Sequence, residues 1–121
     1  MTTAEVAKKL VELCRKGEFL PAVKALYAPN IVSLEAMDMG GTGRTTEGFD
    51  AVLKKSEWWI DNHVVHSAKV GNPFVSPEKF VVQFDIDVTF KPTGKRSQMS
   101  EVGVYTVKNG KVVHEEFLYA E

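Results

Sequence analysis

Three glutamates stand where side chains of this type could move a proton. Glu35 closes a short predicted strand just before a glycine-rich run, and Glu101 and Glu115 lie on the last two predicted strands. A carboxylate at an apolar cavity has its charged form destabilised, so its pKa rises toward the range useful for proton transfer. Repulsion between two carboxylates in one cavity favours keeping one protonated as an acid. Glu35 and Glu101 are therefore the candidate catalytic residues; the alternative is a solvent-facing glutamate, or one paired with Lys or Arg.

The histidines and the cysteine offer less chemistry. His63 and His66 differ by three residues on one predicted strand, so they face opposite sides and cannot chelate one metal. We take His66 as the inward one, whereas His114 has outward parity. No cluster has zinc-ligand spacing, so neither a metal nor another cofactor is expected. Cys14 lies on a buried helical stripe, where a free cysteine is ordinary core.

The segment Lys79–Phe90 decides which side chains face inward. Every second residue from Phe80 to Phe90 is apolar, and the opposite face is polar except for Val81, which is typical of a half-buried antiparallel strand. If this apolar face lines a cavity, antiparallel pairing with the next two strands, Arg96–Val107 and Val112–Tyr119, determines which of their side chains also face the cavity. That set is Met99, Glu101, Gly103, Tyr105, Val107, Val113, Glu115, Phe117 and Tyr119. A slip or bulge of one residue would exchange these with their neighbours.

The predicted pocket combines these strands with the third helix. Its expected lining is Phe84, Ile86, Val88, Met99, Tyr105, Glu115, Phe117, Tyr119, Trp59 and His66. Tyr105, Tyr119 or His66 would donate a hydrogen bond to a developing oxyanion.

The order of the elements predicts an α+β fold. Helices are expected over about Ala4–Lys16, from Phe19 to a stop before Pro29, and over about Glu47–Asn62. Strands are expected at Ile31–Glu35 and His63–Val70, followed by the three long segments named above. Long strands joined by tight turns pair antiparallel, and the helices then gather on one face of the sheet. The prediction is three N-terminal helices over a strongly curved, mostly antiparallel sheet.

Length and composition exclude several classes of protein. The 121 residues fit one domain, 1–121, and the net charge of −1 gives no electrostatic footprint for nucleic acid or an anionic membrane. The basic pairs Lys8-Lys9, Lys54-Lys55 and Lys95-Arg96 are interpreted as solvated faces. No apolar stretch approaches the length of a membrane span, and no signal peptide is recognised. A cytoplasmic location is expected.

Four segments carry a resemblance to a known family. They are Phe19–Asn30, which ends Leu26-Tyr27-Ala28-Pro29-Asn30, then Glu47-Gly48-Phe49-Asp50-Ala51-Val52, Val104–Val113 and Phe117-Leu118-Tyr119. Their order and spacing resemble the nuclear transport factor two-like superfamily, in its SnoaL-like and ketosteroid-isomerase-like branch. The resemblance implies a cone-shaped α+β barrel with an internal cavity, commonly dimeric through the outer sheet face. The prediction is one SnoaL-like domain that forms a homodimer and binds a small hydrophobic molecule, without nucleic acid or membrane as partner.

The resemblance also assigns positions. Glu35 falls where ketosteroid isomerases carry their general-base aspartate, and the protonated aspartate of those enzymes falls near Gly103. Their oxyanion tyrosine has no counterpart, because the first helix reads Lys8-Lys9-Leu10-Val11-Glu12. An unmodified steroid isomerase is therefore not expected. Three hypotheses stay open: a cofactor-independent isomerase, cyclase or lyase that uses carboxylate acid–base chemistry, a non-catalytic ligand-binding domain, and a dimerisation module with a filled core.

Overall fold

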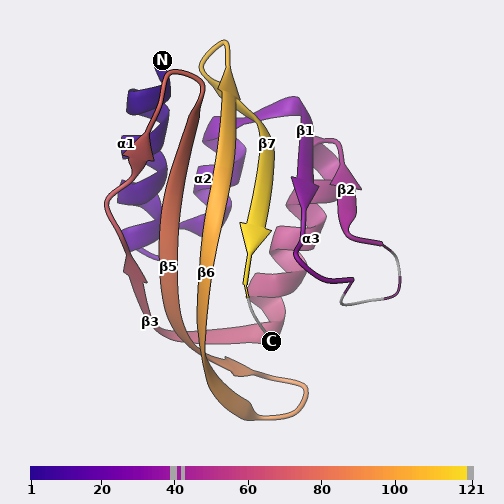
Figure 1. The fold of residues 1–121 in the computed structure, drawn as a ribbon. Helices are drawn as coiled ribbons and strands as arrows, with labels where there is room; N and C mark the ends of the chain where they lie inside the picture. Colours follow the sequence, from indigo (N-terminus) through magenta and orange to yellow (C-terminus); the bar gives the residue numbers. More distant parts are fainter. Residues whose placement is uncertain (39–40, 42, 120–121) are drawn as a thin grey trace.

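Three helices cover one face of a seven-stranded sheet (Figure 1) in the computed structural model, which describes residues 1–38, 41 and 43–119. The helices are α1 (Thr3–Arg15), α2 (Phe19–Leu26) and α3 (Phe49–Asn62). The strands are β1 (Tyr27–Leu34), β2 (Thr45–Glu47), β3 (His63–Val70), β4 (Phe74–Val75), β5 (Lys79–Phe90), β6 (Lys95–Lys108) and β7 (Lys111–Leu118). The α+β class is confirmed. None of the described helices is long and apolar enough to cross a membrane.

The sheet is mixed and open. Its strand order is β2-β1-β7-β6-β5-β3, with β4 paired to β5. The β1–β7 pair is parallel, and the β3–β5, β5–β6 and β6–β7 pairs are antiparallel, as expected for long strands joined by short turns. Because β2 and β3 form the two edges of this path, the described strands do not close into a complete barrel.

Local signals set the ends of most elements. Thr2 and Glu5 form the expected capping box at the start of α1, and Gly17 follows the helix at a φ of 74°. Asn109 and Gly110 both have positive φ, as a tight hairpin turn between β6 and β7 requires. The third helix begins at Phe49 rather than Glu47, because Thr45–Glu47 pairs with the end of β1 as a short strand.

The strand β5 holds the centre of the core. Phe80, Val82, Phe84, Ile86 and Val88 are all buried, which confirms the predicted apolar face. Directly opposite on β6 lie Tyr105, Gly103, Glu101 and Met99, so these side chains share that face.

A register shift between β6 and β7 makes one predicted inward position wrong. Val107 pairs with Val112, which is fully buried, whereas Val113 is only half-buried. The inward place expected for Val113 is therefore taken by Val112. Tyr105 still pairs with Glu115 beyond the bulge, and Gly103 with Phe117. The predicted parity of Glu115 and Phe117 is thus correct, and one bulge accounts for the error.

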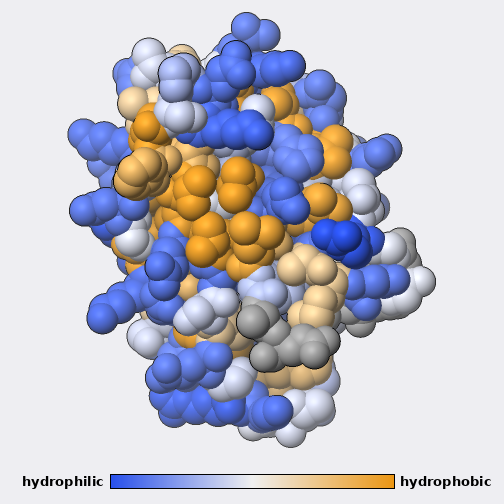
Figure 2. All heavy atoms as spheres, viewed as in Figure 1, coloured by the Kyte–Doolittle hydropathy of each residue, from blue (hydrophilic) through white to orange (hydrophobic). Residues whose placement is uncertain are grey.

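The other face of the sheet has no helix over it. Figure 2 shows apolar residues gathered near the centre of this face. Register places Val81, Val104, Val102 and Leu118 there, because they alternate with the buried residues of β5, β6 and β7. Phe74 pairs with Val81 and is 84% exposed.

Candidate functional site

A row of polar side chains crosses the core face of β6, β7 and β1. Tyr105 pairs with Glu115, which pairs in turn with Ser33, and all three residues are almost fully buried. Both carboxylate oxygens of Glu115 accept hydrogen bonds, one from the Tyr27 hydroxyl and one from Ser33 Oγ at 2.7 Å. Burial raises the pKa of Glu115, while the two hydroxyl donors oppose that change.

Lys55 joins this row to a second carboxylate. Its Nζ donates to Ser33 Oγ at 2.7 Å and to Glu35 Oε1 at 2.9 Å. Lys55 lies three residues after the fully buried Val52 and four before Trp59, so its position on α3 faces the sheet. The interpretation of Lys54-Lys55 as a solvated pair is therefore wrong for Lys55, since an amphipathic stem lets a lysine cross apolar surface to reach acceptors.

Glu35 marks the end of the cluster nearest to solvent. It follows β1 directly, and its Oε2 accepts a hydrogen bond from the Tyr119 hydroxyl at 3.1 Å. The side chains of Glu35 and Lys55 are 28% and 29% exposed, respectively. The cluster thus runs from buried Glu115 to a pair that solvent can reach. Partial burial and the carboxylate of Glu35 raise the pKa of Tyr119.

Glu101 is the carboxyl without a partner. It lies opposite buried Phe84 and is half-buried, yet its side chain makes no hydrogen bond to a described residue. Burial raises its pKa to about 7; the negative charges of Glu35 and Glu115 add to the rise, and Lys55 opposes it. A carboxyl with this pKa exchanges its proton near neutral pH, as a general acid or base must.

Gly103 determines where the ring of Tyr105 lies. A Cβ on Gly103 would come within 2.7 Å of the Tyr105 ring and 2.8 Å of its hydroxyl oxygen. The ring therefore lies over Gly103, along the strand toward Glu101, and stacks on Phe80 at 4.8 Å between centroids. The Tyr105 hydroxyl makes no hydrogen bond to a described residue.

The apolar candidates lie around these groups. Phe84, Ile86 and Val88 are buried, while Met99, Phe117 and Trp59 are partly buried against the same core. Trp59 stacks on His63 at 4.2 Å between centroids. That these residues line a ligand pocket stays a prediction.

His66 does not join the cluster. It falls at a register shift between Val65 and Ser67, is exposed, and places Nε2 2.7 Å from Thr89 Oγ1 on the polar side of β5. The expected inward orientation is therefore wrong, because the bulge breaks the alternation on which it rested.

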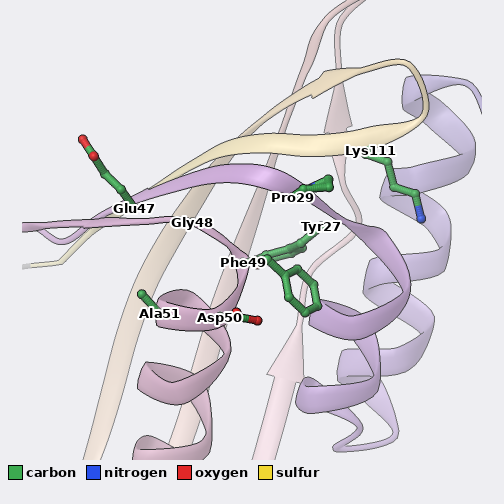
Figure 3. Close-up of a pocket in the computed structure, with 8 residues that line it drawn as sticks. All are labelled: Tyr27, Pro29, Glu47, Gly48, Phe49, Asp50, Ala51 and Lys111. Carbon is green, nitrogen blue, oxygen red and sulfur yellow. The ribbon is translucent and has the colours of Figure 1, made fainter.

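Two surface hollows lie away from the candidate residues. The larger, of about 790 Å³, lies between the start of α3 and the first half of β1. Figure 3 shows Phe49 beside Tyr27 in it, with Lys111 reaching in from β7 and Glu47 pointing away. The smaller, of about 400 Å³, is lined by Arg15, Val70 and their neighbours. Both are open to solvent, and neither is the enclosed apolar cavity expected from the sequence.

Metal ligands do not gather in the described part of the chain. Within residues 1–38, 41 and 43–119, no group of three or more His, Cys, Asp or Glu side chains could hold a metal ion. The hydroxyl, ammonium and carboxyl groups of the cluster can themselves donate and accept protons and hydrogen bonds.

Comparison with known proteins supports the fold and identifies the family. The model of the SnoaL-like domain matches residues 1–119. A crystal structure from Mesorhizobium loti, named as a candidate SnoaL-like polyketide cyclase with carbohydrate phosphatase as a second designation, is 44% identical, covers 98% of this chain and 100% of its own, and has a TM-score of 0.92.

More distant structures share the fold alone. An NTF2-like protein from Burkholderia pseudomallei is 23% identical, covers 99% of this chain and 92% of its own, and has a TM-score of 0.76. A candidate isomerase from Bacillus subtilis is 16% identical, covers 98% and 86%, and has a TM-score of 0.78. No curated protein matches the chain in sequence.

Proposed function

The chain belongs to the SnoaL-like domain family, and on that premise we propose that it is a cofactor-independent isomerase, cyclase or lyase. It acts on a small hydrophobic molecule by carboxylate acid–base chemistry, with Glu101 and Glu35 as catalytic residues. The 44% identical Mesorhizobium loti protein, named as a candidate polyketide cyclase, supports this class of reaction.

The observation that carries the proposal is the unpartnered carboxyl of Glu101. Its pKa of about 7 gives similar populations of acid and base at neutral pH. No buried side-chain oxygen of the described residues lacks a hydrogen-bond partner, so the unpartnered carboxyl oxygens of Glu101 are reached from solvent. Glu101 has no hydrogen-bond partner among the described residues, so its proton is available to a bound molecule.

The polar side chains of the cluster have separate roles in the proposed reaction. Glu35 is held by Lys55 and Tyr119 at the accessible end, where it takes a proton from the substrate as the base. Glu101 returns a proton as the acid, and Tyr105 offers its hydroxyl to an oxygen of the substrate. The apolar side chains of β5 supply walls without competing polar groups.

Hydrogen–deuterium exchange provides a test that needs no knowledge of the product. A panel of hydrophobic ketones is incubated with the protein in D₂O, and loss of the C–H signal next to the carbonyl is followed by proton NMR. We expect exchange with the wild type and with the control Glu57→Gln, an exposed position on α3. Glu101→Gln and Glu35→Gln should lose at least about 100-fold in rate, the usual contribution of a general acid or base.

Two outcomes would overturn the proposal. Exchange that survives both substitutions would remove carboxylate catalysis. Binding of panel members without any exchange would favour the non-catalytic ligand-binding domain.

We also propose that the molecule is a homodimer through the helix-free face of the sheet. Leu118 is 48% exposed and Phe74 is 84% exposed on that face, around the apolar centre seen in Figure 2. A contiguous exposed apolar patch of this kind marks an interaction surface more often than a solvated one.

A further inference from the structure

Ser33 bridges a lysine and a buried glutamate. Lys55 Nζ lies 2.7 Å from Ser33 Oγ, which lies 2.7 Å from Glu115 Oε2. Ser33 is 0% exposed and Glu115 is 3% exposed, so solvent does not compete for these bonds. One hydroxyl therefore separates the ammonium of Lys55 from a carboxylate that it does not touch.

The chemistry of the donors fixes the direction of each bond. An ammonium can only donate, so Ser33 Oγ accepts from Lys55 and turns its own proton toward Glu115. The other oxygen of Glu115 accepts from Tyr27. With both of its oxygens accepting, Glu115 has the hydrogen bonds of an ionised carboxylate. Lys55 also donates directly to Glu35 Oε1 at 2.9 Å.

The charges around this network leave one carboxyl unbalanced. The titratable groups that face it are Cys14 from α1, Tyr27 and Glu35 from β1 and its end, Lys55 from α3, Glu101 and Tyr105 from β6, and Glu115 and Tyr119 from β7. The inward side chains of β5 are apolar. Arg44 also lies beside Glu35, but its guanidinium donates to the backbone carbonyl of Glu35 and not to a carboxylate. Among the described residues, Lys55 is the cation that bonds to side chains of the cluster, and Glu101 is the carboxyl that Lys55 does not reach by a hydrogen bond.

We propose that Lys55 is a positioning residue that decides which carboxyl of this cluster is protonated: through Ser33 it holds Glu115 in the ionised form, so that Glu101 carries the exchangeable proton. This inference deepens the proposed function, because it states which carboxyl serves as acid. It also gives Ser33 and Glu115 a role that does not require contact with substrate. Burial, and after it the negative charges of Glu35 and Glu115, raise the pKa of Glu101. Burial raises the pKa of Glu115 as well. The assignment of Glu115 as the ionised group therefore rests on its hydrogen bonds from Tyr27 and from Ser33, which Lys55 orients.

Carbon-13 NMR of labelled glutamate side chains tests the assignment without any substrate. Signals are assigned from Glu35→Gln, Glu101→Gln and Glu115→Gln, and each variant is titrated through the neutral range. In the wild type we expect Glu101, and not Glu115, to titrate there. In Lys55→Met, which keeps most of the length of the side chain without its charge, Glu115 should also titrate in the neutral range. Lys55→Arg retains the charge and should keep the wild-type pattern.

Ser33→Ala is the second variant, because it keeps Lys55 and removes only the bridge. It should bring the titration of Glu115 into the neutral range, and it decides the question alone if Lys55→Met does not fold. An unchanged titration of Glu115 in both variants, beside a Glu101 that still titrates near neutral pH, would overturn this inference and leave the proposed function standing. A wild type in which Glu115 rather than Glu101 titrates in the neutral range would overturn both.

Discussion

Replacing Glu101 by Gln should change the pH dependence of stability in a defined direction. The folded protein raises the pKa of Glu101 from an ordinary 4.5 to about 7, so the fold binds this proton more tightly than the unfolded chain does. A group of this kind contributes stability below its unfolded pKa, and that contribution is lost as the pH rises toward the folded pKa. Wild-type stability should therefore fall between about pH 4.5 and pH 7 on account of Glu101.

The size of the effect follows from the same two values. At about 1.4 kcal/mol for each pH unit, ionised Glu101 costs the fold about 3 kcal/mol above pH 7. Glutamine has nearly the same shape and never ionises, so Glu101→Gln does not carry this cost. The change that Glu101→Gln makes in the free energy of unfolding should therefore be about 3 kcal/mol more favourable at pH 8 than at pH 4. That difference corresponds to roughly 10 °C in Tm for a domain of this size.

Urea denaturation of wild type and variant at a series of pH values measures the difference directly. Contributions from groups that do not interact with Glu101 appear in both proteins and cancel in that difference. Glu57→Gln, an exposed change on α3, is the matched control and should give a difference that stays flat with pH. A flat difference for Glu101→Gln would refute the reasoning, because it would mean that the carboxyl titrates alike in the folded and unfolded chains.

Three further outcomes are expected. Gly103→Ala should destabilise the protein by about 1–3 kcal/mol in denaturant, since a Cβ would lie 2.7 Å from the Tyr105 ring; wild-type stability would contradict the close approach. Tyr27→Phe removes one donor from buried Glu115 and should cost about 1–3 kcal/mol in the same assay. Leu118→Lys on the helix-free face should give a monomer by light scattering, whereas an unchanged mass would place any interface elsewhere.

The strands could be predicted from the sequence because their alternation is strong. Lys79–Phe90 begins and ends where it was expected, and its pairing with β6 puts Glu101 and Tyr105 on the core face. Bulges were the limit of that reasoning. The bulge between β6 and β7 makes Val112 rather than Val113 the inward residue, and the bulge between β3 and β5 places His66 on the polar side. The residue pattern does not predict where a strand gains an extra residue. The short strands β2 and β4 are too brief to show a period.

The site was only half predictable. Glu35 and Glu101 were expected on strand parity and on resemblance, and the structure places both on the core side of the sheet. Lys55 was missed because two adjacent lysines suggested a solvated face, although its spacing from Val52 and Trp59 is that of the buried helical stripe. Ser33 gave no signal, because a buried serine becomes functional only through the partners that the fold brings to it.

The most direct test of the account is the titration of the Glu101 carboxyl itself, followed by its carbon-13 chemical shift in the otherwise unmodified protein. The account predicts a midpoint near pH 7. A midpoint at the ordinary value of 4.5 would contradict it, because an ionised Glu101 at neutral pH would have no proton to give.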